Sequence, residues 1–409
     1  MVIRDCQVLQ RDGDDKARLH LAGGDVLELP VGGPYEVGAA RQVLVGDLWV
    51  LAGQSNMEGV GDLVEVESPS PFVHSFQSCE RWAIAAEPLH WLAESPRPVH
   101  HALLGRDPIP DSPEQRDPLR GKGVGPGLAF AKEYYARTGV PVGLIPSAHG
   151  GTSLTQWDPG LRDRGGDSLY GATMERIAAV GGKIAGVLWY QGESEANPQD
   201  AEHFHDRASA LTEAFRRDLR RPDLPFYFVQ IGCVFGDAGQ GWGWSPEAWS
   251  TVREAQRRLA GVLPHSGMVT AIDLELDDLI HIGTPGQARL GRRLAGVATG
   301  RPTPDLVGAR VEGPSVRVAF SGLQGRLQAA GRPSGFSLRD AAGRELPMVY
   351  KTTLDGSTAV LYLALDAQYN EARLQEGTYL WYGWGCRPYC NVTDDADMAI
   401  PAFGPLPLA

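Results

Sequence analysis

The chain has 409 residues, of which 43% are apolar and 22% are charged, and its formal net charge is −12. This composition predicts a soluble globular protein long enough for more than one hydrophobic core. The acidic balance disfavours nucleic acid and anionic membranes as partners, because no basic excess is present to neutralise phosphates. No stretch approaches the roughly 20 apolar residues that a membrane helix needs.

The first 45 residues predict a β segment. Short apolar or alternating stretches are separated by Gly and Asp, as in CQVLQRD, ARLHLAG and VLELPVG. Residues 301–409 show the same pattern of short strand-like stretches between turn residues, and we therefore expect residues 1–45 to pack with a C-terminal β-rich module. The N-terminus lacks the charged start and long apolar core of a signal peptide. We expect a cytoplasmic protein, or a secreted or periplasmic one whose export signal has been removed.

Residues 46–300 alternate between two kinds of segment. Short, continuously apolar runs predict buried parallel strands at Leu48–Leu51, Val142–Pro146, Ile184–Tyr190, Pro225–Ile231 and Met268–Ile272. Amphipathic stretches predict helices at Pro126–Thr138, Leu169–Val180, Asp200–Leu219, Pro246–Leu263 and Pro285–Val297. This alternation predicts an α/β doubly wound domain with a five-stranded parallel sheet. The proline-rich stretch 60–122 is too long for a plain connection and is typical of segments that shape a binding site.

After residue 301 the chain predicts a separate β-rich module, 301–409, with alternating or apolar runs between turns rich in Gly, Asp and Asn. Five cysteines in a chain of this length do not form a disulfide framework. Cys386 and Cys390 can pair if their loop folds back, or stay reduced. No CxxC pair or HExxH helix indicates a metal site.

Polar motifs follow the predicted strands at the points where ligands bind in open parallel sheets. Ser55 follows the first strand, Gly150 and Gly151 follow the second, Gln191 the third, and the DDLIHIG stretch the fifth. Alone, Ser55 has two interpretations: the N-cap of the next helix, which is the commoner use of serine, or a nucleophile. The other motifs favour the nucleophile.

Together these residues supply the groups that an acyl-transfer reaction needs. A serine hydroxyl needs an imidazole to take its proton, and the imidazole needs a carboxylate at its other nitrogen. Asp278 and His281 are three residues apart and can meet across one turn. The tetrahedral intermediate needs donors for its oxyanion, available from the Ser55 N–H, a glycine N–H of Gly150-Gly151 and the Gln191 amide. No serine satisfies GxSxG, which excludes the nucleophile elbow of α/β-hydrolases.

Four blocks in this domain resemble those of the SGNH hydrolases, in the family's order: GQSNMEG, GGTSLTQW, WYQGESE and DLIHIGTPGQARLG. Within that superfamily they resemble carbohydrate acetylesterases of the acetylxylan-esterase and sialate O-acetylesterase types. The resemblance implies a flavodoxin-like α/β domain and no metal or organic cofactor. GQSN in place of GDS, and glutamine in place of asparagine in the third block, favour a sugar ester over a lipid ester.

The resemblance implies Ser55 as nucleophile, His281 as general base and Asp278 as its carboxylate, with Asp277 as the rival. Gly151 and Gln191 complete the oxyanion hole with the Ser55 N–H. Three neighbouring side chains are expected to have structural roles. Asn56 and Glu58 hydrogen-bond the backbone of the turn around Ser55, and Glu193 orders the Gln191 loop.

The predicted reaction is hydrolysis of an O-acetyl ester on a carbohydrate through an acetyl-serine intermediate. Trp157, Trp242 and Trp244 are candidate surfaces for stacking a sugar ring, with core packing as the alternative for Trp157. Two other functions stay open: a non-catalytic carbohydrate-binding protein on an esterase fold, and an esterase of short acyl groups on other substrates. The glycan (xylan, xyloglucan, pectin or sialic acid) and the oligomeric state are not indicated.

Overall fold

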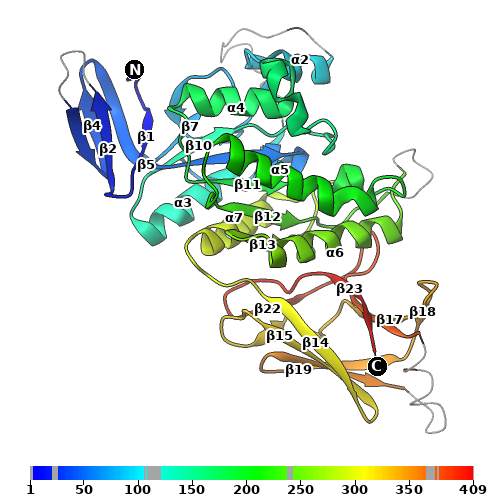
Figure 1. The fold of residues 1–409 in the computed structure, drawn as a ribbon. Helices are drawn as coiled ribbons and strands as arrows, with labels where there is room; N and C mark the ends of the chain where they lie inside the picture. Colours follow the sequence, from blue (N-terminus) through cyan, green and yellow to red (C-terminus); the bar gives the residue numbers. More distant parts are fainter. Residues whose placement is uncertain are drawn as a thin grey trace.

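The structure is a computed structural model that describes residues 3–20, 26–105, 107, 121–236, 243–364, 374 and 377–408. A central α/β domain lies between a small N-terminal β-sheet and a C-terminal β module (Figure 1). Among the helices that the structure describes, none has the length and apolar character needed to cross a bilayer.

The central sheet contains all five predicted strands, which are parallel and run in the order β13-β12-β11-β5-β10. When these five strands are numbered along the chain, the order is 2-1-3-4-5, which is the flavodoxin-like order. The point at which the strand order reverses lies beside β5, between β5 and β11. The strands are β5 (Ala40–Gly53), β10 (Val142–Pro146), β11 (Gly186–Tyr190), β12 (Phe226–Gln230) and β13 (Ser266–Thr270).

The prediction of five strands was incomplete, because the 60–122 stretch adds two more. Strand β7 (Val73–Phe76) pairs in parallel with β10, and β8 (Trp82–Ile84) pairs antiparallel with β7. Both strands are short, and β7 carries the polar residues His74 and Ser75 in buried positions. The apolar pattern is therefore interrupted in β7, and in β8 it is only three residues long. The same stretch pairs β6 (Gly61–Asp62) with β9 (Lys122–Val124).

Helices cover both faces of the sheet, as a doubly wound domain requires. Helices α4, α5 and α6 lie on one face, and α3 and α7 pack against each other on the other face (Figure 1). The helices are α1 (Ser55–Glu58), α2 (Pro98–Leu104), α3 (Gly127–Thr138), α4 (Leu169–Ala179), α5 (Phe204–Asp218), α6 (Pro246–Val262) and α7 (Thr284–Ala298). Short 3-10 helices occur at Leu92–Glu94, Pro159–Asp167, Glu193–Glu195 and Ala201–His203.

The expectation that residues 1–45 pack with the C-terminal module is wrong. Strands β1 (Val8–Gln10) and β4 (Gly32–Val37) pair with the first half of β5. Strands β2 (Lys16–His20) and β3 (Val26–Pro30) form a hairpin beside them, and a small separate core lies between these strands. Because β5 has 14 residues, it continues beyond the central sheet and carries the N-terminal strands to the opposite end of the molecule from the C-terminal module (Figure 1).

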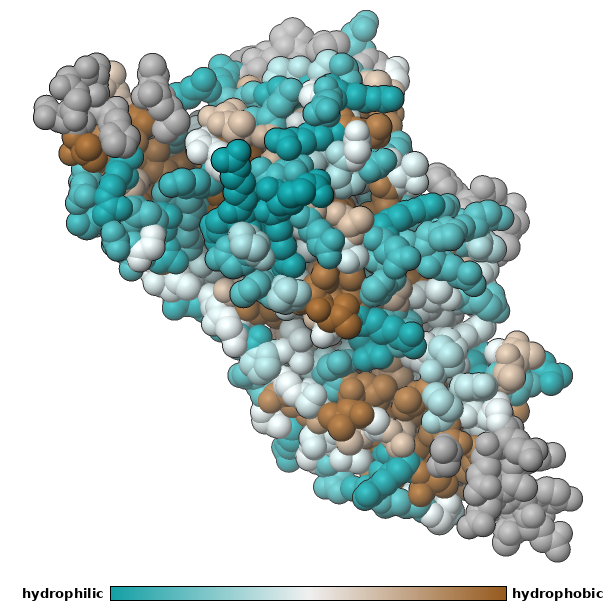
Figure 2. Space-filling view, viewed as in Figure 1, coloured by the Kyte–Doolittle hydropathy of each residue, from teal (hydrophilic) through white to brown (hydrophobic). Residues whose placement is uncertain are grey.

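The C-terminal module consists of antiparallel strands around its own core. One sheet is ordered β14-β15-β20-β19, a second β18-β17-β21-β23, and β16 pairs with β22. The strands are β14 (Asp305–Glu312), β15 (Ser315–Ser321), β16 (Leu327–Ala329), β17 (Phe336–Arg339), β18 (Glu345–Leu346), β19 (Val349–Asp355), β20 (Thr358–Leu363), β21 (Tyr379–Tyr382), β22 (Val392–Asp394) and β23 (Phe403–Pro407). Hydrophilic residues cover much of the face viewed in Figure 2, and hydrophobic ones are grouped over this module.

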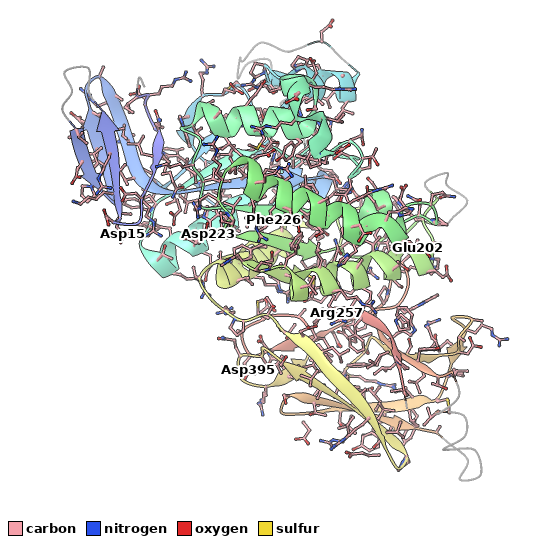
Figure 3. All side chains as sticks on the ribbon, in the orientation of Figure 1. Asp15, Glu202, Asp223, Phe226, Arg257 and Asp395 are labelled. Carbon is pink, nitrogen blue, oxygen red and sulfur yellow. The ribbon has the colours of Figure 1, made fainter. Side chains whose placement is uncertain are left out.

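Side chains of α6 and β12 join the module to the central domain. Arg257, at the edge of α6 that faces the module, donates to Asp305 of β14 at 3.0 Å (Figure 3). The buried Arg253 donates to the carbonyls of Gly383 and Gly385 at 3.0 and 2.6 Å. Gln230 at the end of β12 exchanges two hydrogen bonds with the backbone of Ala402. The module is therefore fixed against the carboxyl-end side of the sheet.

Candidate active site

The residues predicted to be catalytic follow the carboxyl ends of neighbouring parallel strands. Ser55 follows β5, Gly151 follows β10, Gln191 follows β11, and the Asp278–His281 loop follows β13. In the sheet register Gly53 of β5 lies opposite Tyr190 of β11. The topology thus places all four segments at one edge, where open α/β sheets bind their ligands.

Ser55 stands in a tight strand-to-helix turn. Gly53 has φ +127°, and a Cβ at this position would lie 2.1 Å from the carbonyl oxygen of Tyr190, so only glycine fits. Gln54 is the residue before α1 and Ser55 is the first helical residue, so the capping interpretation of Ser55 is wrong. Ser55 is 8% exposed, and its hydroxyl makes no hydrogen bond to any residue that the structure describes.

Asp278 and His281 are in direct contact. The two carboxylate oxygens of Asp278 lie 2.8 and 3.0 Å from His281 Nδ1. Burial alone would raise the pKa of Asp278, but hydrogen bonds from the Ile280 N–H, the His281 ring and the His281 N–H lower this pKa well below its ordinary value. The carboxylate therefore stays ionised and directs the second ring nitrogen, Nε2, away from itself.

A further charged side chain, that of Lys122, contacts this pair. Lys122 Nζ lies 3.3 Å from Asp278 Oδ2 and 3.2 Å from Asp62 Oδ1. Asp277, the rival carboxylate, instead accepts from the backbone N–H of Asp62 at 2.8 Å and of Thr284 at 3.3 Å. Asp277 thus joins the start of α7 to β6, and Asp278 is the carboxylate on the imidazole. No sequence motif pointed to Lys122.

Asn56 links the serine turn to the histidine loop. Its Nδ2 donates to the Ile280 carbonyl at 3.3 Å, and its Oδ1 accepts from the Ile282 N–H at 3.0 Å. These are the residues on either side of His281, so the residue next to Ser55 fixes the backbone of His281. The sequence indicated only that Asn56 bonds the backbone of its own turn.

A buried carboxylate supports Asn56 from the other side. Asn56 Nδ2 also donates to Glu193 Oε1 at 2.9 Å. Burial raises the pKa of Glu193 to about 7, with the Asn56 hydrogen bond opposing that shift. Glu193 Oε2 is buried without a hydrogen-bond partner among the described residues. Glu193 therefore orders the Asn56 side chain more directly than the Gln191 loop.

Two backbone N–H groups are available for an oxyanion. A Cβ built on Gly150 would lie 3.4 Å from Ser55 Cβ, which places this loop beside the serine. The Gly150 N–H donates to Glu58 Oε2 at 2.6 Å. Gly151 has φ +68° and open space beside it, and within the described part of the chain neither its N–H nor that of Ser55 has a hydrogen-bond partner. Both N–H groups are therefore available to bind an oxyanion.

Gln191 does not fit that role in this arrangement. Its side chain is fully buried, and its Nε2 donates to the Thr152 carbonyl at 3.2 Å and to the Glu195 carboxylate. Both amide hydrogens are therefore engaged, and none is left for an oxyanion. Glu195 also accepts from the Leu154 N–H. Gln191 and Glu195 thus hold the loop that follows Gly151, and the oxyanion assignment of Gln191 needs correction.

The tryptophans predicted to stack on sugars fall into three cases. Trp157 is 0% exposed, donates to Thr152 Oγ1 and packs edge-on against Trp189, so it belongs to the core and cannot stack on a sugar. Trp242 lies outside the described residues. Trp244 is half-buried, donates to the Glu193 carbonyl at 3.1 Å and packs edge-on against Trp249.

The site holds the kinds of groups that nucleophilic acyl transfer needs. Among the described residues it combines a serine hydroxyl without a hydrogen-bond partner, an imidazole oriented by a carboxylate and two backbone N–H groups without a partner. Among the described residues no cluster of three or more His, Cys, Asp or Glu is placed to hold a metal ion. All five cysteines, including Cys386 and Cys390, are free thiols.

Comparisons with known proteins match the chain to carbohydrate esterases. A family model described as "Carbohydrate esterase, sialic acid-specific acetylesterase" matches residues 45–299. The chain is 30% identical over 271 residues to a probable carbohydrate esterase of Arabidopsis thaliana, covering 61% of this chain and 88% of that protein. It is 24% identical over 285 residues to the sialate O-acetylesterase of Homo sapiens, covering 59% of this chain and only 53% of that enzyme.

A solved structure shares the fold over nearly the whole length. The crystal structure of a carbohydrate acetylesterase from Xanthomonas citri superposes with a TM-score of 0.69 at 23% identity, covering 98% of this chain and 97% of that chain. The likeness therefore includes both β-rich flanks.

Proposed function

Because this chain belongs to the family of carbohydrate esterases described as sialic acid-specific acetylesterases and is a carboxylic ester hydrolase, we propose a serine mechanism acting on O-acetyl groups of a carbohydrate. The acetylated glycan is a plant cell-wall polysaccharide or oligosaccharide, or a sialic acid. The observation that supports the mechanism is the 2.8 Å contact between Asp278 and His281, in a loop whose backbone is hydrogen-bonded to the side chain of Asn56, the residue after Ser55.

The first half-reaction forms an acetyl-enzyme. His281 Nε2 takes the proton of the Ser55 hydroxyl as its oxygen attacks the acetyl carbonyl carbon. The negative charge on the carbonyl oxygen is bound by the N–H groups of Ser55 and Gly151. As the tetrahedral intermediate collapses, the sugar oxygen leaves with the proton from His281. The ionised Asp278 stabilises the imidazolium during this step.

The second half-reaction releases acetate. His281 takes a proton from water, whose oxygen attacks the acetyl group on Ser55, and the same two N–H groups bind the second oxyanion. Collapse breaks the ester bond to Ser55 and returns the proton to the Ser55 oxygen. No group outside the chain is needed for proton balance, because the imidazole accepts and returns one proton in each half-reaction.

The test is release of acetate from acetylated xylan and from O-acetylated sialic acid, with 4-nitrophenyl acetate as a simple ester. Ser55→Ala is expected to lower kcat by about 10⁴-fold or more. Ser147→Ala is the matched control, since among the described residues the hydroxyl of this buried serine, which follows β10, makes only a 3.4 Å hydrogen bond, to the Ile145 carbonyl. Full activity of Ser55→Ala would exclude the mechanism. A wild-type protein that binds acetylated glycans without releasing acetate would be a carbohydrate-binding protein instead.

A further inference from the structure

A cleft of about 920 Å³ lies between the central domain and the C-terminal module. Phe235, Glu275 and Leu276 line it from the central domain, and Gln328, Tyr389 and Thr393 line it from the module. Its volume is at the upper end of the range of about 300–1,000 Å³ that small-molecule sites occupy, and far exceeds the need of one acetyl group. The cleft is therefore large enough for sugar residues beyond the acetylated one.

Backbone hydrogen bonds connect the wall of the cleft to the loop that carries Asp278 and His281. Asp278 itself belongs to its wall. The Phe235 N–H donates to the Leu279 carbonyl at 2.7 Å, and the Val234 N–H donates to the Cys386 carbonyl at 2.9 Å. The loop after β12 thus connects the histidine loop with the module segment that carries Tyr389. A ligand in the cleft lies against the same loop that holds Asp278.

Two aromatic side chains in the cleft are exposed to solvent. Tyr389 is 72% exposed and Phe235 is 53% exposed, although aromatic residues of this size are mostly covered in a folded chain. The guanidinium of Arg387 lies over the Phe235 ring, 5.8 Å from its centre, as in a cation–π contact. Exposed aromatics in a concave surface with polar neighbours indicate a binding site.

The charges of the cleft disfavour an acidic ligand. Its lining contains the carboxylates of Asp273, Glu275, Asp278 and Asp397 and the guanidinium groups of Arg289 and Arg387. Arg289 is already engaged, because it donates to Asp397 at 2.9 Å and to Asp273 at 3.2 Å. Arg293 also donates to Asp273, and Lys122 pairs with Asp278, so these carboxylates are largely neutralised. Of the two lining arginines only Arg387 has no carboxylate partner among the described residues, so the cleft offers an anionic sugar little free positive charge, whereas a neutral sugar needs none.

We propose that this cleft binds the sugar residues next to the acetylated one in a neutral oligosaccharide, with Tyr389 and Phe235 as the surfaces on which pyranose rings stack. The C-terminal module is then one wall of the substrate site. This inference rests on the proposed function for the location of the acetyl group, at Ser55. It selects a neutral, chain-like glycan from the candidate substrates.

The kinetic test compares an acetylated xylohexaose with 4-nitrophenyl acetate. Tyr389→Ala and Phe235→Ala are each expected to raise KM for the hexasaccharide about tenfold with little change in kcat, and to leave hydrolysis of the small ester within about twofold. Tyr350→Ala is the matched control, because Tyr350 is a 59% exposed tyrosine of the same module that does not line the cleft. Unchanged KM in both cleft variants would overturn the proposal.

A binding test separates this proposal from the esterase mechanism. Ser55→Ala is titrated with unacetylated xylohexaose and with the acidic hexagalacturonate, with and without Tyr389→Ala. Binding of xylohexaose that Tyr389→Ala weakens supports the cleft, even if the wild type releases no acetate and the proposed function fails. Preference for hexagalacturonate, or xylohexaose binding that Tyr389→Ala leaves unchanged, overturns it, even if acetate release succeeds.

Discussion

The side chain of Asn56 is hydrogen-bonded to the backbone on both sides of His281. Since Asn56 follows Ser55 directly, the nucleophile and the general base are parts of one hydrogen-bonded unit although they lie more than 220 residues apart in the chain. Gln287 of α7 adds a bond to the Asn56 carbonyl at 3.2 Å. The relative position of serine and histidine therefore depends on one buried amide.

We predict that Asn56→Ala lowers kcat for 4-nitrophenyl acetate by about 10²-fold with little change in KM, because a displaced base no longer meets the serine proton. Its free energy of unfolding should also fall by about 1–3 kcal/mol, since Glu193 and the Ile282 N–H lose their partner. The control is Gln10→Ala, which removes an amide bonded to the Leu48 N–H at 2.7 Å in the N-terminal sheet. Equal losses of kcat in both variants would contradict a positioning role.

Much of the α/β domain was predictable because its strands are continuous apolar runs and its helices are amphipathic. Four of the five predicted strands occur within two residues of their expected ends, whereas β5, predicted at Leu48–Leu51, begins eight residues earlier, at Ala40. Strand β7 was missed because the buried polar residues His74 and Ser75 interrupt the apolar pattern, and β8 because its apolar run is only three residues long. The segment against which residues 1–45 pack was predicted wrongly. Similar strand-like patterns at the two ends of a chain do not determine which strands pair.

The parts of the site that depend on the spacing of residues along the chain could be predicted from the sequence. The parts that depend on how distant loops pack together could not. Asp278 and His281 are three positions apart in the chain, and the structure brings their side chains into contact. The partners of Gln191 come from loops at Thr152 and Glu195, so the sequence could not show that its hydrogens are already used. Likewise Trp157 is a core residue only because Trp189 and Thr152 enclose it.

The corrected role of Gln191 gives a second prediction. Gln191→Met removes both donors while filling similar space, and it should lower the free energy of unfolding by about 1–3 kcal/mol because Glu195 and the Thr152 carbonyl lose a buried partner. Its kcat for 4-nitrophenyl acetate should fall less than about tenfold, whereas loss of an oxyanion donor costs about 10²–10³-fold. A loss of that larger size with unchanged stability would return Gln191 to the oxyanion hole.

Arg253 is predicted to hold the C-terminal module in place. This fully buried guanidinium donates to the carbonyls of Ile231 at 3.0 Å and Gly232 in the central domain, and to those of Gly383 and Gly385 in the module. Arg253→Met should lower the free energy of unfolding by about 3 kcal/mol or more, because several buried carbonyls lose a charged donor.

The measurement for Arg253→Met is thermal unfolding together with limited proteolysis, which should release the C-terminal module more readily. The control is Arg258→Ala on the same helix, since Arg258 is largely exposed and bonds only Glu254 among the residues described. Surface pairs of this kind contribute about 0–1 kcal/mol. If Arg253→Met unfolds like Arg258→Ala, the carbonyl contacts do not stabilise the junction.

The buried Glu193 predicts a pH-dependent stability with a definite sign. Burial raises its pKa in the folded protein to about 7 from an ordinary value of 4.5. Between these two pH values the folded state holds a proton that the unfolded state has lost, so the free energy of unfolding decreases as pH rises through this window. The largest slope from one such group is about 1.4 kcal/mol per pH unit.

Glu193→Gln removes this titration while keeping an oxygen that can accept from Asn56 Nδ2. Urea unfolding of both proteins from pH 4.5 to 8 should therefore show a smaller decrease for the variant. Glu195, whose pKa burial also raises to about 7, contributes the same slope to both proteins and cancels in the comparison. Parallel curves for wild type and Glu193→Gln would mean that Glu193 is already ionised in the folded protein at pH 5, with Asn56 and water supporting its charge.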